Sequence, residues 1–175
     1  MTTLYIDESK SKGYTIVTAA IITADIGAMR KEIAKLRKNG QNRVHFVSES
    51  PARRREILAV LVSLGLTARI YHAERMKEPE AREKCLARVV ADATHHGVSK
   101  IVLERDASVE QFDRRILYRE IESNRVQGTI QYSHDTAKNE PLLWIPDAIA
   151  WSFARGGEWK TRIKPLVIDV TDVSR

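Results

Sequence analysis

Cysteine is almost absent from this sequence, with Cys85 the only one among 175 residues. A single thiol excludes an internal disulfide framework and a zinc site built from several thiolates, and it fits a reducing compartment. Helical spacing places Cys85 on the same side of its segment as Val89. We therefore expect it to be a small core hydrophobe.

Long apolar runs are absent as well. The longest, near Ile16 to Ile22, is too short to cross a bilayer, and the amino terminus is charged from Asp7 onward, unlike a signal peptide. Glycine and proline are sparse, and no linker, repeat or low-complexity tract is present. We expect a cytoplasmic protein without a membrane partner, folded as one domain over residues 1–175.

Positive charge exceeds negative charge. The 29 lysines and arginines outnumber the 23 acids, which gives a formal net charge of +6. Basic clusters bind phosphates with release of counterions, so this balance favours a nucleic-acid partner, either DNA or RNA. Arg53, Arg54 and Arg55 with Arg37 and Lys38 could form such a surface, although a solvated helix face is the simpler interpretation.

The hydrophobic pattern predicts an initial hairpin followed by alternating helices and strands. Residues 3–8 and 14–23 are apolar and β-branched, and a polar turn joins them. Ser50 and Pro51 predict a helix start, and Ser108 to Gln111 have the spacing of a capping box. Later strands are expected at 68–73, 100–105, 129–133 and 167–170, with helices at 79–96 and 141–153. We predict an α/β fold with a mixed central sheet, an early antiparallel hairpin and helices on both faces.

Carboxylates stand at the ends of apolar segments, where burial is costly unless a cation or a hydrogen-bond donor neutralises them. The candidates are Asp7 and Glu8 at the end of the first strand, Glu104 and Asp106 at the end of the strand near residue 101, and Asp147 at the start of the last long helix. Because side chains alternate along a strand, only one of Asp7 and Glu8 can face a common site. Glu104 and Asp106 would share a face.

Acids brought together from separate elements repel one another, and a divalent cation with hard oxygen ligands relieves that repulsion. We expect Asp7, Glu104, Asp106 and Asp147 to be catalytic and metal-ligating, with Mg²⁺ or Mn²⁺ as the cofactor. Two such ions about 4 Å apart activate a water and stabilise the leaving oxygen in phosphodiester cleavage. The plain alternative is that these acids are solvated caps or ordinary ion-pair partners.

Three segments resemble the family known as domain of unknown function 3800. They are Tyr5-Ile6-Asp7-Glu8-Ser9 with the strand after it, Val44-His45-Phe46 before a helix, and Leu142-Leu143-Trp144-Ile145-Pro146-Asp147-Ala148-Ile149-Ala150. The resemblance covers nearly the whole chain and implies a ribonuclease H-like fold, whose members hold metals with strand and helix carboxylates for nuclease or strand-transfer chemistry. It supports Asp7 and Asp147, and leaves Glu104, Asp106 or Glu74 as the middle acid.

The sequence departs from that family at two positions. Lys10 stands where the family has glycine, and Pro146 stands where it has alanine. Neither change removes a carboxylate.

The sequence thus predicts a metal-dependent nuclease or another phosphodiester-processing enzyme. One alternative is a catalytically inactive nucleic-acid-binding or protein-interaction module of the same fold. Another is a phosphatase in which Asp7 is the nucleophile and Asp169 and Asp172 bind Mg²⁺, which leaves Glu104 and Asp147 without roles.

Two further features have simple structural interpretations. Trp144 and Trp151 are seven residues apart among apolar neighbours, which favours core packing over base stacking. His134 and Asp135 are adjacent in a loop, and we expect a surface pair in preference to a proton shuttle.

Overall fold

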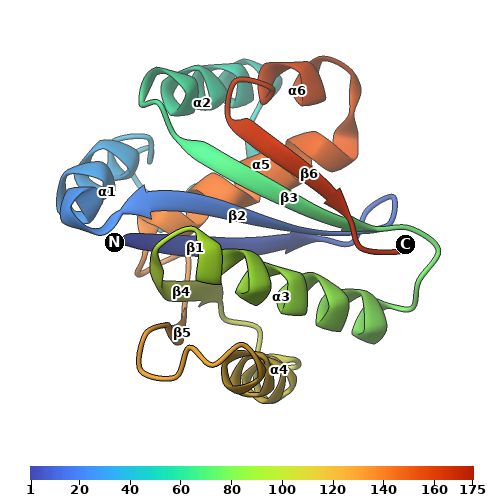
Figure 1. Cartoon of the computed structure of the whole chain (residues 1–175). Coiled ribbons are helices and arrows are strands. Elements are labelled where there is room, and N and C mark those ends of the chain that lie inside the picture. The colour runs from blue at the N-terminus through green and yellow to red at the C-terminus, as the bar shows by residue number, and fades with distance from the viewer.

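A computed structural model describes all residues 1–175 and contains one six-stranded sheet with helices on both faces (Figure 1). The strands are β1 (Thr2–Ser9), β2 (Tyr14–Ile22), β3 (Thr67–Ala73), β4 (Val98–Glu104), β5 (Gln131–Asp135) and β6 (Val167–Asp172). The helices are α1 (Ile26–Ala34), α2 (Pro51–Ser63), α3 (Glu78–His95), α4 (Glu110–Ser123), α5 (Trp144–Arg155) and α6 (Gly157–Arg162).

The strand order across the sheet is β5-β4-β1-β2-β3-β6. β1 and β2 form the predicted antiparallel hairpin, with Thr2 opposite Ile22 and Ser9 opposite Thr15. β4 runs parallel to β1, β5 runs parallel to β4, and β6 runs parallel to β3. The carboxyl ends of β1, β4 and β5 therefore meet at one edge of the sheet, where ligand sites of open α/β sheets commonly lie.

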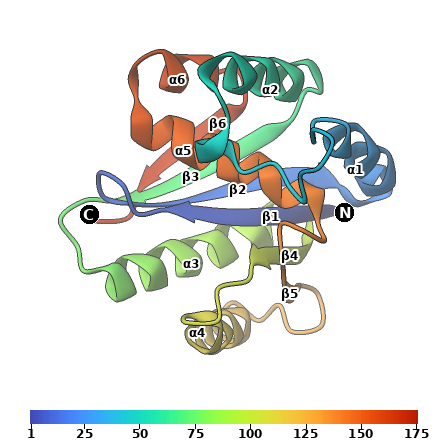
Figure 2. The same cartoon turned by 180° about the vertical axis from the view of Figure 1, so that it is seen from behind.

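Helices cover both faces of the sheet (Figures 1 and 2), and a hydrophobic core lies between the sheet and the helices on each face. On one face α1, α2, α5 and α6 cover the sheet, with Tyr5 and Val102 as the strand residues beneath α5. On the other face α3 and α4 pack against Ile6 and Leu103. From Leu4 to Ile6 on β1 and from Ile101 to Leu103 on β4, successive side chains thus alternate between the two faces.

The start of α2 agrees with its predicted signals. The Ser50 hydroxyl accepts a hydrogen bond from the Arg53 N–H at 3.2 Å, and Pro51 opens the helix. Gly65 follows the helix with a φ of 66°, a left-handed conformation that glycine adopts without steric cost. Propensity and capping are therefore sufficient to set the limits of this helix.

The capping box predicted at Ser108 is wrong. α4 begins at Glu110, and Ser108 uses its N–H and its hydroxyl to bind the Asp106 carboxylate at 2.9 and 2.6 Å. The backbone carbonyl of Asp106 accepts the Glu110 N–H at 2.9 Å. A charged acceptor two residues away competes better for the serine than the helix backbone does.

Cys85 and Trp144 are core residues, as predicted. Cys85 is fully buried, and burial raises the pKa of its thiol to about 12. Trp144 is also buried, and its indole N–H donates to the Ala137 carbonyl at 2.6 Å. None of the helices combines the length and the apolar character required to span a bilayer.

Replacing the α2 cap tests the local origin of this helix. Ser50→Ala removes the acceptor of the Arg53 N–H, and we expect it to lower the free energy of unfolding by about 1 kcal/mol in urea denaturation. Ser50→Asp keeps an acceptor and should retain most of the stability. Equal losses for both substitutions would contradict a capping role.

Candidate active site

Asp7 and Glu8 face opposite sides of the sheet at the end of β1. Tyr5 belongs to the core beneath α5 and Ile6 to the core beneath α3, so alternation turns Asp7 toward α5 and Glu8 toward α3. The Asp7 carboxylate accepts the Glu8 N–H at 2.7 Å, which fixes its orientation. The two adjacent acids therefore occupy different environments.

Glu104 reaches the same face as Asp7 from the neighbouring strand. β1 and β4 pair in parallel, with Tyr5 opposite Val102 and Ile6 opposite Leu103. Asp7 and Glu104 are the next residues along the two strands. The negative charge of Glu104 is the largest contribution to the raised pKa of Asp7 after burial. Neighbouring parallel strands thus place two acids side by side at their carboxyl ends.

Asp147 approaches this pair from α5. Pro146 and Asp147 lie in the first turn of that helix, where proline is tolerated because its missing N–H has no helical partner. The Asp147 carboxylate accepts the Phe46 N–H at 3.1 Å. Phe46 lies on the segment between α1 and α2, which passes across α5 in Figure 2.

Burial and neighbouring charges raise the pKa of two of these carboxyl groups, those of Asp7 and Asp147. Burial raises the pKa of Asp7 well above its ordinary range, and the negative charges of Glu104 and Asp147 raise it further. Burial also raises the pKa of Asp147, against the opposing effects of the Phe46 N–H and the Arg43 guanidinium. The cluster thus carries more negative charge than its surroundings neutralise.

Arg43 is the cation of this cluster. Its Nη1 donates to Glu104 Oε1 at 3.0 Å, and its Nη2 lies 3.8 Å from Asp147 Oδ2. Its charge also lowers the pKa of Asp7, although not enough to offset burial and repulsion. No spacing in the sequence pointed to Arg43, because it lies in an irregular segment far in number from its partners.

Asp106 lies near these acids with its carboxylate engaged elsewhere. β4 ends at Glu104, so the strand alternation that would place Glu104 and Asp106 on one face stops before Asp106. Its hydrogen bonds with Ser108 lower its pKa below the ordinary value. Asp106 nevertheless lines a pocket of about 430 Å³ with Asp7 and Glu104.

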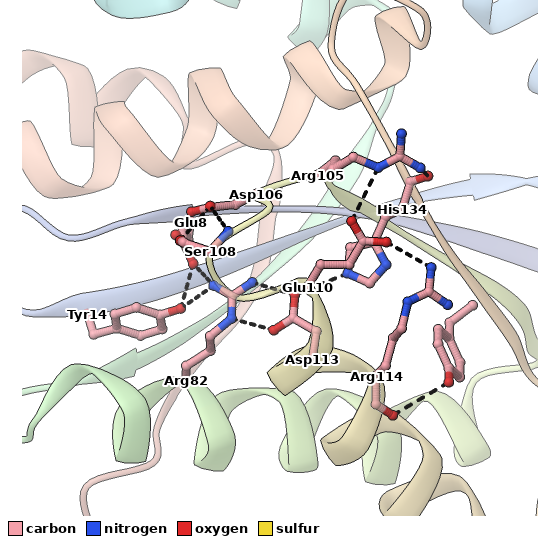
Figure 3. A network of polar contacts seen from close by, with 11 residues as sticks. Glu8, Tyr14, Arg82, Arg105, Asp106, Ser108, Glu110, Asp113, Arg114 and His134 are labelled. Atoms are coloured by element: carbon pink, nitrogen blue, oxygen red, sulfur yellow. Dashed lines mark hydrogen bonds and ion pairs between the residues drawn. The ribbon is translucent and has the colours of Figure 1, made fainter.

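This pocket opens beside the carboxyl ends of β1 and β4, and Figure 3 shows some of its walls. Apolar side chains from the α3 side form part of it, and charged side chains form the rest. Its lining residues are Ile6, Asp7, Glu8, Ile16, Arg82, Leu103, Glu104, Arg105, Asp106 and Ala107. The pocket is of the size that small ligands or parts of larger substrates occupy.

A buried ionic network fixes the other side of β1 (Figure 3). Arg82 on α3 forms an ion pair with Glu8 and donates from Nε and Nη2 to the two oxygens of Asp113 at 2.5 and 2.8 Å. Arg82 also donates to the Tyr14 hydroxyl at 2.7 Å, and that hydroxyl donates to Glu8 at 2.6 Å. Burial raises the pKa of Asp113, but hydrogen bonds with Arg82 and His134 outweigh it and leave the pKa low.

His134 belongs to this network, so the predicted surface pair with Asp135 is wrong. Its side chain is fully buried, and Nε2 lies 3.1 Å from Asp113 Oδ2. Because an ionised carboxylate only accepts, Nε2 carries the proton, and Nδ1 has no hydrogen-bond partner. The sequence did carry a signal for Arg82, which shares a helical stripe with Cys85 and Leu86 and therefore needs a buried acid.

The remaining candidate acids lie away from the cluster. Glu74 is exposed and pairs with His72 at 3.3 Å. Asp169 and Asp172 lie on β6, which is separated from β1 by β2 and β3. The phosphatase alternative, which needs these two acids beside Asp7, gains no support from this arrangement.

The arginines at the start of α2 make internal contacts. Arg53 donates to the Leu36 carbonyl at 2.5 Å, and Arg55 pairs with Glu158 at 2.8 Å. The Arg54 guanidinium lies 4.2 Å from the ring centroid of Trp151, which in turn packs against Phe46. This face stabilises the contact of α2 with α5 and α6, and its guanidinium groups are committed to protein partners.

The donor set fits a hard divalent cation by its chemistry. Its candidate ligands are carboxylate oxygens with unneutralised charge, the type that Mg²⁺ and Mn²⁺ prefer. In this structure no three His, Cys, Asp or Glu side chains stand in an arrangement that could hold a metal ion. Arg43 contacts both Glu104 and Asp147, so a guanidinium already engages oxygens of these carboxylates.

The strand order and connections define a ribonuclease H-like fold, as predicted from the sequence. The chain is similar to a chain in the structure described as the PCNA:RNase HII complex from Archaeoglobus fulgidus, with a TM-score of 0.59 and 14% identity over 94% of this chain and 77% of that chain. At this identity the likeness concerns the fold alone. No family model and no curated protein matches the sequence.

Removing Arg82 should be among the most destabilising single changes. Arg82→Met leaves the buried Asp113 carboxylate without its guanidinium partner and leaves the half-buried Glu8 with Lys10 alone, and we expect a loss of about 3–5 kcal/mol in the free energy of unfolding, measured in urea. Arg88→Met is the matched control, because Arg88 forms an exposed pair on the same helix and should cost at most about 1 kcal/mol. Similar losses for both would contradict the structural role of the network.

Removing the Asp7 charge should stabilise the metal-free protein. Asp7→Asn keeps an oxygen for the Glu8 N–H but ends the repulsion with Glu104 and Asp147, so in EDTA near pH 7 we expect a gain of about 1 kcal/mol. Because folding raises the pKa of Asp7, the wild type loses stability as the pH rises from the ordinary value of 3.8 through the folded pKa.

Thermal denaturation from about pH 4 to about pH 8 measures both effects, because the difference between the two proteins should grow with pH. Asp169→Asn, on β6, is the control and should leave the slope unchanged. A destabilised Asp7→Asn protein near pH 7 would show that the cluster is fully neutralised without a metal.

Proposed function

We propose that this protein is a metal-dependent nuclease that hydrolyses phosphodiester bonds in DNA or RNA. One observation carries the proposal: Glu104 and Asp147, from a neighbouring strand and from a helix, share the Arg43 guanidinium, and their charges raise the pKa of the half-buried Asp7. Unneutralised acids of this kind are costly, and a divalent ion offsets that cost. The ribonuclease H-like fold and the net charge of +6 support the same assignment.

In this proposal Asp7, Glu104 and Asp147 hold Mg²⁺ or Mn²⁺, and Asp106 acts from the adjoining pocket wall. When bound, the ion would act as a Lewis acid that activates water and stabilises the leaving oxygen of the phosphodiester. The chain orients the ligands itself, because the Glu8 N–H fixes Asp7 and the Phe46 N–H fixes Asp147. The proposal also places the chain in the family known as domain of unknown function 3800, on the motifs around Asp7 and Asp147.

The second candidate is an inactive nucleic-acid-binding or protein-interaction module of the same fold. Arg43 favours it, because this guanidinium already neutralises part of the cluster without any metal. In that case the acids and Arg43 would form a structural ion-pair group. Metal binding separates the two candidates.

The deciding experiment combines Mn²⁺ calorimetry with cleavage assays on single- and double-stranded DNA and RNA and on RNA–DNA hybrid. We expect the wild type to take up Mn²⁺ and cleave at least one substrate, and Asp7→Asn or Asp147→Asn to reduce cleavage by roughly 100-fold or more. Asp169→Asn, made and purified identically, should keep wild-type activity. Unchanged cleavage by the Asp7→Asn protein would contradict the nuclease assignment. Unchanged Mn²⁺ binding by the same protein would contradict it as well.

A further inference from the structure

We propose that Arg43 is a resident cation that a divalent metal displaces, and that the displaced guanidinium then binds the phosphodiester of the substrate. This inference rests on the proposed function for its second half, because only a phosphoryl substrate brings an anion to this place. Its first half, competition between a side chain and a metal for the same carboxylates, is independent of catalysis.

The contacts of Arg43 are the contacts a metal would need. Its guanidinium binds Glu104 at 3.0 Å and lies 3.8 Å from Asp147. It is also the cation that counteracts the crowding of Asp7. A dication that takes oxygens from these three groups cannot keep a guanidinium on the same oxygens, because like charges repel and each oxygen has few lone pairs.

The position of Arg43 in the chain suits a side chain that changes partners. Residues 35–45 contain neither helix nor strand, and the Arg43 side chain is 28% exposed. Just after it, Val44 and Phe46 are buried and hold the backbone in place. The backbone at Arg43 is therefore held beside the cluster, while its side chain is only half-buried.

A guanidinium released here is well suited to a phosphodiester. Its planar fork of donors matches two phosphate oxygens, which a lysine ammonium cannot reproduce. The metal would bring the substrate's phosphate beside the same carboxylates that Arg43 leaves. Arg43 would thus neutralise the carboxylates in the absence of metal and bind the substrate phosphate when metal is present.

The primary test is Mn²⁺ calorimetry on wild type, Arg43→Ala, Arg43→Gln and Arg37→Ala, without nucleic acid. We expect both Arg43 variants to bind Mn²⁺ about 10-fold more tightly than the wild type, because no guanidinium has to leave. In EDTA their melting temperatures should be lower than that of the wild type, and saturating Mn²⁺ should remove the difference. Arg37→Ala takes the same charge from the same exposed segment and should bind Mn²⁺ like the wild type.

Cleavage at saturating Mn²⁺ tests the second half. We expect Arg43→Ala to lose roughly 10- to 100-fold in kcat/KM, with Arg43→Lys recovering only part, because a lysine lacks the bidentate fork. Unchanged cleavage in Arg43→Ala would overturn the substrate role. Full recovery by lysine would overturn the requirement for the fork.

The possible outcomes separate this inference from the proposed function. If the wild type binds Mn²⁺ and the Arg43 variants bind it equally or more weakly, the displacement is refuted while the nuclease assignment survives. If only the Arg43 variants bind Mn²⁺, the guanidinium and the metal compete for the cluster, but the metal does not displace Arg43 from the wild type, so the displacement and the nuclease assignment both fail. If neither binds it, both fail.

Discussion

Strand alternation at the end of β1 is the constraint on which the rest of this structure depends. It places Asp7 and Glu8, two adjacent acids, on opposite faces of the sheet. On each face an arginine from a distant part of the chain lies close to the acid. Arg82 neutralises Glu8 inside a network whose hydrogen bonds are almost complete. Arg43 neutralises the Asp7 side only in part, because one guanidinium faces three carboxylates.

The two sides therefore differ in what they contribute. On the α3 side, buried charges are paired and hydrogen-bonded, which makes the network a rigid support for the end of β1. On the α5 side, the acids remain under mutual repulsion, and the pKa of Asp7 stays raised. Groups with such raised pKa values are common where a ligand binds, which is the basis of the nuclease proposal.

Much of the fold followed from local patterns. The hairpin, the α2 limits and the alternation of helices with strands were predictable because burial and capping act over a few residues. The errors at Ser108 and His134 have one cause. In each case a carboxylate, Asp106 or Asp113, offered a stronger partner than the one suggested by sequence neighbours.

The sequence by itself determined that acids end the apolar segments at Asp7, Glu104 and Asp147, and that Asp7 and Glu8 must diverge, because side-chain alternation is a local property of the backbone. Only the tertiary structure decided that Glu104 stands beside Asp7 and that Arg43 supplies the cation. Those outcomes depend on strand order and on a loop crossing α5. They arise from contacts between residues far apart in number, which spacing along the chain does not encode.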